Sequence, residues 1–219
     1  MLLSIAFFPP VSWLAALAEG FILYPDRVEP SHVWLEASEH YQKQSYRNRC
    51  LIATANGVEA LSFPVIHAGK DPSSLPIREV RVDWSTPWLL RLERAFDSAY
   101  ETSAFYEYYR DELFSVLESR PETLWDLDME VIRFILSKTG IKADFRLTDT
   151  YLKVAPESML PDFRETIHPK RENKILESLG LKKPYFQVFA QKYGFKSNLS
   201  AADLLFNEGP DSITFLKRL

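Results

Sequence analysis

The first eighteen residues carry no charged side chain, and this stretch constrains the fold more than any other feature of the sequence. Pro9 and Pro10 divide it into two apolar runs, each too short for a membrane span, which needs about 20 apolar residues in succession. No Lys or Arg precedes Arg27, so the basic region of a signal peptide is missing. We therefore expect a buried strand over residues 2–8, a helix over residues 11–18, and a cytoplasmic protein without a membrane span.

Beyond this stretch strand-like and helix-like patterns follow one another without a linker, so we predict one domain over residues 1–219. An apolar run at residues 21–24 follows the first helix, and strand, helix and strand in this order are typical of a parallel βαβ opening. Asn56-Gly57 separates two strand-like segments, 46–54 and 58–65, and predicts a hairpin because both positions tolerate a positive φ. Further strands are expected over residues 33–36, 77–82 and 145–152.

The rest of the chain shows the 3.6-residue spacing of amphipathic helices. Thr123 followed by Asp126, and Ser200 followed by Asp203, are two capping-box pairs at the start of apolar stripes. Helices are predicted over residues 88–100, 105–119, 123–140, 185–193 and 200–209. The predicted fold class is α/β: a small central sheet, made of the βαβ-like start and the hairpin, covered by helices.

Composition excludes several classes of function. The formal charge is −4 and the pI about 5.7, which argues against binding to nucleic acid by neutralisation of phosphates. The single cysteine, Cys50, excludes an internal disulfide and a cysteine-based zinc site, and its apolar successors favour a core residue over a nucleophile paired with His40. The sequence has no glycine-rich phosphate loop and no metal-ligand spacing around its four histidines, so we expect neither a cofactor nor a metal.

The densest polar segment is residues 39–50. If its second half forms a strand, Arg47 and Arg49 share one face about 7 Å apart, which suits the oxygens of a phosphate, a pyrophosphate or a carboxylate. His40 and Lys43 just upstream add a proton donor and a further cation. The alternative is an exposed strand face whose charges pair with neighbouring carboxylates.

Two further polar clusters lie in loops, which often carry function when a rigid scaffold positions them. Residues 162–170, around His168, form the first, and residues 207–209, at a helix end, form the second. The alternative for each is a turn whose polar groups satisfy their own backbone. Asp126 and Asp128 we attribute to helix capping and to the helix dipole rather than to catalysis.

A set of short motifs runs along nearly the whole chain. They are Phe8-Pro9, Lys43-x-Ser45-Tyr46-x-Asn48-Arg49, Asn56-Gly57, Phe63-Pro64-Val65, Asp162-Phe163-Arg164-Glu165-x-Ile167-His168-Pro169-Lys170, Lys183-Pro184-Tyr185-Phe186-Gln187-Val188-Phe189 and the stretch from Asn198 to Pro210. In this order they resemble the WbqC-like protein family, and within it the branch found in Bacteroides-type bacteria. The resemblance implies a setting, bacterial surface-polysaccharide biosynthesis, and it implies no particular reaction.

The polar clusters in this setting predict an enzyme, a transferase acting on an activated sugar or an acyl intermediate. Its substrate is expected to be a small molecule, a sugar nucleotide or an acyl donor. Arg47 and Arg49 are expected to hold a diphosphate or a carboxylate with help from Lys43, and His40 or His168 to act as general base. The other predicted substrate-binding residues are Tyr46, Asn48, Gln187 and Asn207. The hypothesis requires His40, one of the two arginines, His168 and Asn207 to meet in one pocket.

The alternative is a non-catalytic ligand-binding or assembly module of the same pathway. A histidine that members of the family usually carry in the helix after the tryptophan is missing between Trp88 and Tyr100. In a module of this kind an exposed aromatic patch, with Tyr106, Tyr108 or Phe189, is expected to mark the interface.

Overall fold

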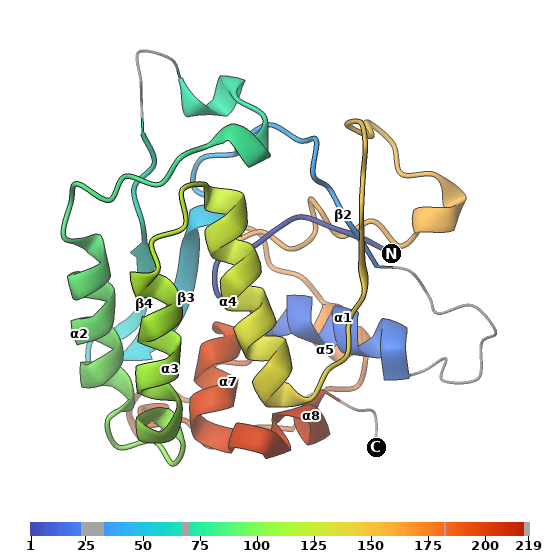
Figure 1. Ribbon diagram of the computed structural model, residues 1–219. Coiled ribbons are helices and arrows are strands. Elements are labelled where there is room, and N and C mark those ends of the chain that lie inside the picture. Colours follow the sequence, from blue (N-terminus) through green and yellow to red (C-terminus); the bar gives the residue numbers. More distant parts are fainter. Residues whose placement is uncertain (23–32, 67–70, 182, 217–219) are drawn as a thin grey trace.

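The computed structural model describes residues 1–22, 33–66, 71–181 and 183–216 (Figure 1). A parallel sheet with the strand order β1-β2-β5 joins distant parts of the chain. Its three strands are β1, Leu2–Leu3, β2, Val33–Leu35, and β5, Phe145–Leu147. The helix α1, Val11–Ile22, follows β1 in the chain. The predicted α/β class with a small sheet and a parallel opening is confirmed.

The opening segment differs from the prediction in its details. Strand pairing ends at Leu3, and the chain then turns at Phe8, whose φ of 42° is left-handed, so the strand predicted over residues 2–8 is too long. The helix α1 continues beyond its predicted end, so residues 21 and 22 are helical, whereas residues 23 and 24 of the expected strand lie outside the described residues. The strand that pairs with β1 in parallel is β2, and not the segment at residues 21–24 that the sequence predicted.

The predicted hairpin is confirmed. Its strands are β3, Arg49–Thr54, and β4, Gly57–Ser62. Gly57 has a φ of 109°, a value that favours glycine. β3 begins later than predicted because Ser45 Oγ accepts a hydrogen bond from the backbone N–H of Arg47 and caps a 3₁₀ turn at Tyr46–Asn48. The prediction that Arg47 and Arg49 share one face of a strand is therefore wrong.

Three long helices pack beside the hairpin and the sheet. They are α2, Trp88–Tyr100, α3, Tyr106–Glu118, and α4, Leu124–Thr139. Figure 1 shows α4 between α3 and α1. Thr123 caps α4 as predicted, because its Oγ1 accepts a hydrogen bond from the backbone N–H of Asp126 over 3.1 Å. In the described part of the chain no helix combines the length and the apolar character that a membrane span requires.

Asp128 has a different environment from Asp126. Its side chain is fully buried, and neither carboxylate oxygen has a hydrogen-bond partner among the described residues. Burial raises the pKa of Asp128 well above its usual range, because removal from water disfavours the charged carboxylate. The attribution of Asp128 to helix capping is therefore wrong.

The last part of the chain contains short helices joined by turns. They are α5, Ile175–Ser178, α6, Ala190–Tyr193, α7, Ala201–Glu208, and α8, Ser212–Phe215. The helix predicted over residues 185–193 is thus limited to its second half. Ser200 caps α7, but its predicted capping partner Asp203 points into the interior and binds other side chains. Two predicted strands are also corrected: residues 77–79 form a 3₁₀ turn, and the strand expected over 145–152 ends at Leu147.

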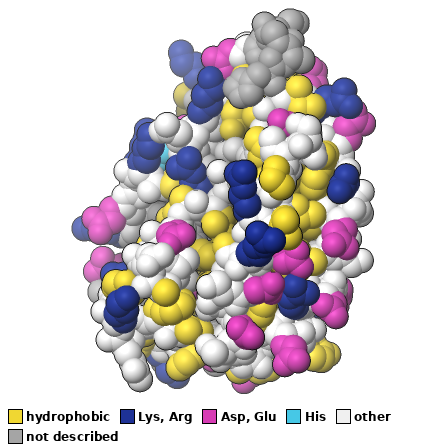
Figure 2. Space-filling model, turned by 90° about the vertical axis from the view of Figure 1, so that its left-hand side faces the viewer, with side chains coloured by type: hydrophobic (Ala, Val, Ile, Leu, Met, Phe, Trp, Pro, Cys, Tyr) yellow, Lys and Arg dark blue, Asp and Glu magenta, His cyan; other side chains and the backbone are white. Residues whose placement is uncertain are grey.

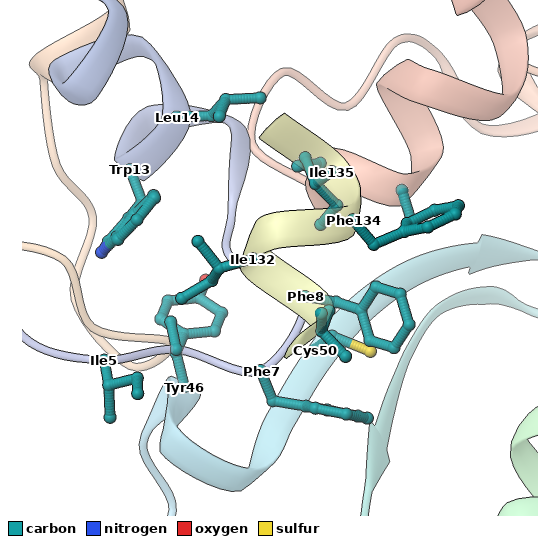
Figure 3. Close-up of a cluster of buried hydrophobic side chains, with 14 of the residues drawn as sticks. Ile5, Phe7, Phe8, Trp13, Leu14, Tyr46, Cys50, Ile132, Phe134 and Ile135 are labelled. Carbon is teal, nitrogen blue, oxygen red and sulfur yellow. The ribbon is translucent and has the colours of Figure 1, made fainter. Parts of the chain in front are cut away.

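Aromatic side chains from separate segments form the core. Phe8 meets Phe96 with ring centroids 5.2 Å apart, and Phe96 meets Phe206 at 5.7 Å, so α2 and α7 pack on the segment that follows β1. Figure 3 shows Cys50 beside Phe8 in this core. Cys50 is fully buried, which confirms the prediction of a core residue, and burial raises the pKa of its thiol.

Candidate functional site

Three polar residues stand at the carboxyl ends of the parallel strands. Ser4 follows β1, Glu36 follows β2 and Thr148 follows β5. Thr148 Oγ1 donates a hydrogen bond of 2.5 Å to Glu36 Oε1, which ties the ends of two neighbouring strands together. Ligands of α/β proteins commonly bind just outside the carboxyl ends of parallel strands, so this edge is where a site is expected.

Two buried ion pairs lie at the same edge. Arg164 Nη1 donates to Glu36 Oε2 over 2.8 Å, and the two side chains are 8 % and 0 % exposed. Arg47 binds both carboxylate oxygens of Glu39, with Nε to Oε1 at 2.7 Å and Nη2 to Oε2 at 2.5 Å. Ser4 Oγ accepts from Arg47 Nη2 over 2.8 Å and connects this pair to the end of β1. When an ion pair is fully hydrogen-bonded, these bonds offset the cost of removing its charges from water. The two pairs therefore hold their side chains in fixed positions at this edge of the sheet.

A cleft of about 880 Å³, hereafter the polar cleft, is lined by parts of both ion pairs. Residues 38–43, which follow β2, form one wall, and residues 162–171 contribute to the other. Gln42 Nε2 donates to Glu165 Oε1 over 3.3 Å, so the two walls touch although 123 positions separate these residues in the chain. The polar clusters singled out at residues 39–50 and 162–170 therefore meet.

Basic side chains predominate among the exposed charged residues of the polar cleft. Lys43, Lys153 and Arg171 are exposed and basic, whereas Glu165 is the exposed acidic residue of the lining. Lys43 pairs with Asp71 over 2.9 Å, and Arg171 pairs with Glu165 over 3.0 Å. Lys153 has no hydrogen bond or ion pair within the described ranges. This balance favours an anionic ligand.

Both predicted catalytic histidines line the polar cleft. His168 Nδ1 accepts a hydrogen bond from the backbone N–H of Lys170 over 3.2 Å. Burial, together with the nearby Arg171 guanidinium, lowers the pKa of His168, so its imidazole is neutral at pH 7 and carries its proton on Nε2. His40 is exposed, and its ring has no hydrogen bond to any residue that the structure describes. The two imidazoles thus differ: His168 presents an N–H donor, and the ring of His40 is free.

A second cleft of about 910 Å³, hereafter the apolar cleft, shares Tyr41 and Lys43 with the polar cleft. It lies between β4 and the beginning of α2, and Asn48 also lines it. Asn48 Nδ2 donates to the carbonyl oxygen of Phe63 over 2.7 Å, which fixes the base of the hairpin. Figure 2 shows the side of the molecule that is on the left in Figure 1, with hydrophobic side chains at the surface between basic ones. Asn48, which was predicted to bind substrate, thus lines the apolar cleft, whereas His40 and His168 line the polar cleft.

The structure gives Arg47 and Tyr46 internal positions. Arg47 is 3 % exposed, and its Nε, Nη1 and Nη2 all donate to protein oxygens, with Gln42 Oε1 at 3.2 Å from Nη1. Tyr46 is 6 % exposed, and Figure 3 shows its ring near Ile132 in the core. Burial raises the pKa of Tyr46 to about 12. Neither side chain lines the polar cleft or the apolar cleft.

Arg49 lies at the start of β3 and is half-buried. Its Nε atom is buried and lacks a hydrogen-bond partner among the described residues. The residues that line the two clefts do not include it. Its predicted contact with substrate stays a prediction.

Gln187 and Asn207 lie elsewhere, around Asp203 of α7. Gln187 Nε2 donates to Asp203 Oδ2 and to the carbonyl oxygen of Lys196, both over 2.9 Å. Asn207 Nδ2 donates to the Asp203 carbonyl oxygen over 2.7 Å. Figure 1 shows α7 at the bottom of the view and residues 150–165 at the upper right. These two amides therefore connect the C-terminal segments to each other and do not line the polar cleft.

Of the four groups that the hypothesis requires to meet, only the histidines His40 and His168 line one cleft. Arg47 binds Glu39 in the wall without lining the cleft, and Asn207 lies outside it. Sequence reasoning missed Glu36 and Thr148, which bind behind the polar cleft, and it placed Arg164 in a polar cluster without giving it a role. A signal was present for Glu36, because a carboxylate directly after a buried apolar strand is costly unless it has a partner.

Comparisons with known proteins agree with the resemblance read from the motifs. The model of the WbqC-like protein family matches residues 27–215. The chain is also 24 % identical over 223 residues to "Uncharacterized protein Rv1507c" of Mycobacterium tuberculosis, which covers 93 % of this chain and 90 % of that protein. No solved structure matches significantly. The motifs read from the sequence and a family match over most of its length show that this chain belongs to the WbqC-like protein family.

Proposed function

We propose that the chain is a transferase that binds the anionic part of an activated sugar or acyl donor in the polar cleft. One observation carries the proposal: residues 38–43 and 162–171, which are far apart in the sequence, enclose one cleft at the carboxyl ends of the parallel strands. The cleft has two imidazoles and an excess of exposed basic side chains. Bacterial surface-polysaccharide biosynthesis as the setting rests on the family resemblance.

The cleft residues divide into three roles in this proposal. Lys153 and Arg171 hold the anion, because both are exposed and Lys153 has no competing partner among the described residues. His168 donates its Nε2–H to the same anion, since its Nδ1 is occupied by the backbone. His40 is the general base toward the acceptor hydroxyl or amine, because its exposed ring lines the cleft and no described residue occupies its nitrogens. Arg47 is a positioning residue that holds Glu39 and the wall beginning there.

Isothermal titration calorimetry against a panel of nucleotide sugars and acyl-coenzyme A compounds tests the proposal. The Arg171→Ala variant is expected to bind the recognised ligand about tenfold or more weakly, because a charge-assisted hydrogen bond contributes roughly 1.5–3 kcal/mol. Arg133→Ala is the matched control: Arg133 is also an exposed arginine in one ion pair, with Glu130 at 2.7 Å, but it lies on α4 outside the polar cleft. If no compound binds, or if both variants bind like the wild type, the proposal fails.

A non-catalytic binding module is the second candidate, and one observation favours it. Within the described residues no carboxylate or other acceptor orients the ring of His40, as a general base usually requires. The aromatic interface expected for a module has one of its members at the surface: Tyr108 is 79 % exposed, whereas Tyr106 is buried and donates to Asp97 Oδ1 over 2.7 Å. Ligand binding without product in a mass-spectrometric assay, unaffected by His40→Ala, supports the module and excludes the transferase.

A further inference from the structure

The two clefts meet at Tyr41 and Lys43, which line both of them. They differ in chemistry. The polar cleft is lined by charged groups and histidines, whereas most residues that line the apolar cleft are hydrophobic, among them Leu61, Phe63, Pro64, Val65, Trp88 and Leu92, and its charged members are Lys43, Asp83 and Arg91. The pair of clefts therefore suits a ligand with an anionic part and an apolar part.

The apolar cleft has a rigid floor. Phe63 is 1 % exposed and packs against Trp88 with ring centroids 5.4 Å apart. Trp88 in turn packs against Trp84 at 4.8 Å. Pockets lined by packed aromatic and aliphatic groups are usually formed before the ligand arrives, so little ordering of the protein opposes binding.

We infer that the apolar cleft receives the acyl chain of a thioester donor whose phosphate-bearing carrier lies in the polar cleft. This inference rests on the proposed function and decides between its two donor classes. A nucleotide sugar is polar along its whole length and leaves the hydrophobic lining without a partner. An acyl thioester on a phosphorylated carrier has the required order of an anionic group, a polar connection and an apolar end.

The transfer is balanced without any oxidant or reductant. The acceptor hydroxyl or amine attacks the thioester carbonyl carbon and forms a C–O or C–N bond. The C–S bond breaks, and its electron pair leaves with sulfur. The proton that the acceptor loses passes to the imidazole of His40 and then to the departing thiolate, so the products are an ester or amide and a free thiol.

Chain-length dependence of binding is the direct test. Coenzyme A and its acetyl, butyryl and hexanoyl thioesters are titrated into the full chain by calorimetry. Each methylene that becomes buried is expected to increase the affinity about fourfold. The binding of coenzyme A itself, which reports on the polar cleft, is expected to differ little between variants of the apolar cleft.

Two variants on one strand distinguish an effect of filling the apolar cleft from an effect of adding a large side chain elsewhere on the surface. Ala60 and Val58 are exposed on the same side of β4, and Ala60 lines the apolar cleft whereas Val58 does not. Ala60→Trp fills the cleft and is expected to abolish the increase with chain length, while Val58→Trp keeps it. Both substitutions are at exposed positions, and equal urea midpoints confirm that both variants are folded.

The outcomes distinguish this inference from the proposed function. If coenzyme A and all thioesters bind equally in every variant, the acyl-chain inference is overturned and the anion site remains. If nucleotide sugars bind and the thioesters do not, the inference is also overturned while the transferase proposal stands. If no compound of either class binds, both fall.

Discussion

Arg47 and Glu39 form a buried, doubly hydrogen-bonded ion pair in which both side chains are about 95 % or more shielded from solvent. Glu39 belongs to a wall of the polar cleft, and Arg47 belongs to the 3₁₀ turn before β3. The pair therefore joins the candidate site to the hairpin.

Removal of one partner of this pair should strongly destabilise the fold. Arg47→Ala leaves the Glu39 carboxylate buried and without its charge partner, which typically lowers the free energy of unfolding by about 3–5 kcal/mol. Urea unfolding followed by circular dichroism measures the loss. The double variant Glu39→Gln, Arg47→Met is expected to recover part of it because no unpaired charge remains.

An exposed ion pair provides the control for this experiment. Arg133 and Glu130 on α4 are 62 % and 45 % exposed, and pairs of this kind contribute about 0–1 kcal/mol. Arg133→Ala should therefore change stability little. Equal losses for Arg47→Ala and Arg133→Ala would contradict the importance assigned to the buried pair.

Asp203 should make the stability of the fold depend on pH. Its carboxylate accepts hydrogen bonds from Tyr100, Tyr185 and Gln187, but burial outweighs them and raises the pKa of Asp203 to about 6. The folded state then retains a proton that the unfolded state loses near its ordinary pKa of 3.8. The stabilisation is thus complete below about pH 3.8 and is lost as the pH rises through about 6, in total about 3 kcal/mol at 1.36 kcal/mol per pKa unit.

Comparison of the wild type with Asp203→Asn isolates this contribution. Asp128, whose pKa is also raised, changes stability in the same direction in both proteins, so it cancels in the difference. The difference in unfolding free energy should shift in favour of the variant by about 2.4 kcal/mol between pH 4 and pH 7, because part of the total lies below pH 4. A constant difference over this range would show that the Asp203 pKa is unshifted.

Gly209, directly after α7, should not tolerate a side chain. It has a φ of 54°, and a Cβ atom there would lie 2.5 Å from the Phe105 ring. Gly140, after α4, also has a left-handed φ, 71°, but a Cβ there meets nothing within 4 Å. Gly140→Ala is expected to destabilise by about 1–2 kcal/mol through backbone strain, and Gly209→Ala by a further 1–3 kcal/mol, roughly, through overpacking. Thermal unfolding of the two variants measures the difference, and equal losses would contradict the predicted clash.

Cys50 should be unreactive in the folded protein. Its side chain is fully buried and its pKa is raised by burial, so little thiolate is present or accessible. An aromatic disulfide reagent at pH 8 is expected to leave it unmodified and to modify it fully in guanidinium chloride. Val58→Cys adds an exposed thiol as the positive control. Modification of Cys50 in the folded wild type at the rate of that thiol would contradict the buried position.

The sequence predicted correctly those turns and helix ends that depend on residues only a few positions apart. The Asn56-Gly57 turn and the Thr123 cap each depend on groups a few positions apart, and both are present. The strand expected from residue 46 is the opposite case. Its alternating pattern is real, but one hydrogen bond from the Arg47 N–H to Ser45 Oγ is enough to form a turn there and to change the direction of Arg47.

The candidate site was predictable in its segments and not in the partners of each residue. Both polar clusters that meet in the polar cleft were recognised from their residue types. Gln187 and Asn207 are also polar side chains that were expected to bind substrate. Their amides instead bind groups of α7 and of the segment before it. Whether an amide faces a ligand or a buried carboxylate depends on contacts across many positions, and residue type does not report these.

The hydrogen bonds of Glu36 and Thr148 behind the polar cleft have a consequence for how far its walls can vary. Glu36 and Thr148 are fixed by strands, and their hydrogen bonds do not involve the outer parts of the two walls. Insertions or exchanges in residues 40–43 or 165–171 leave those bonds intact, since loops on a rigid base tolerate change better than the base does. The outer walls of the proposed site can therefore change without loss of the hydrogen-bonded base that carries them, in the way that antibodies vary their loops on a constant framework.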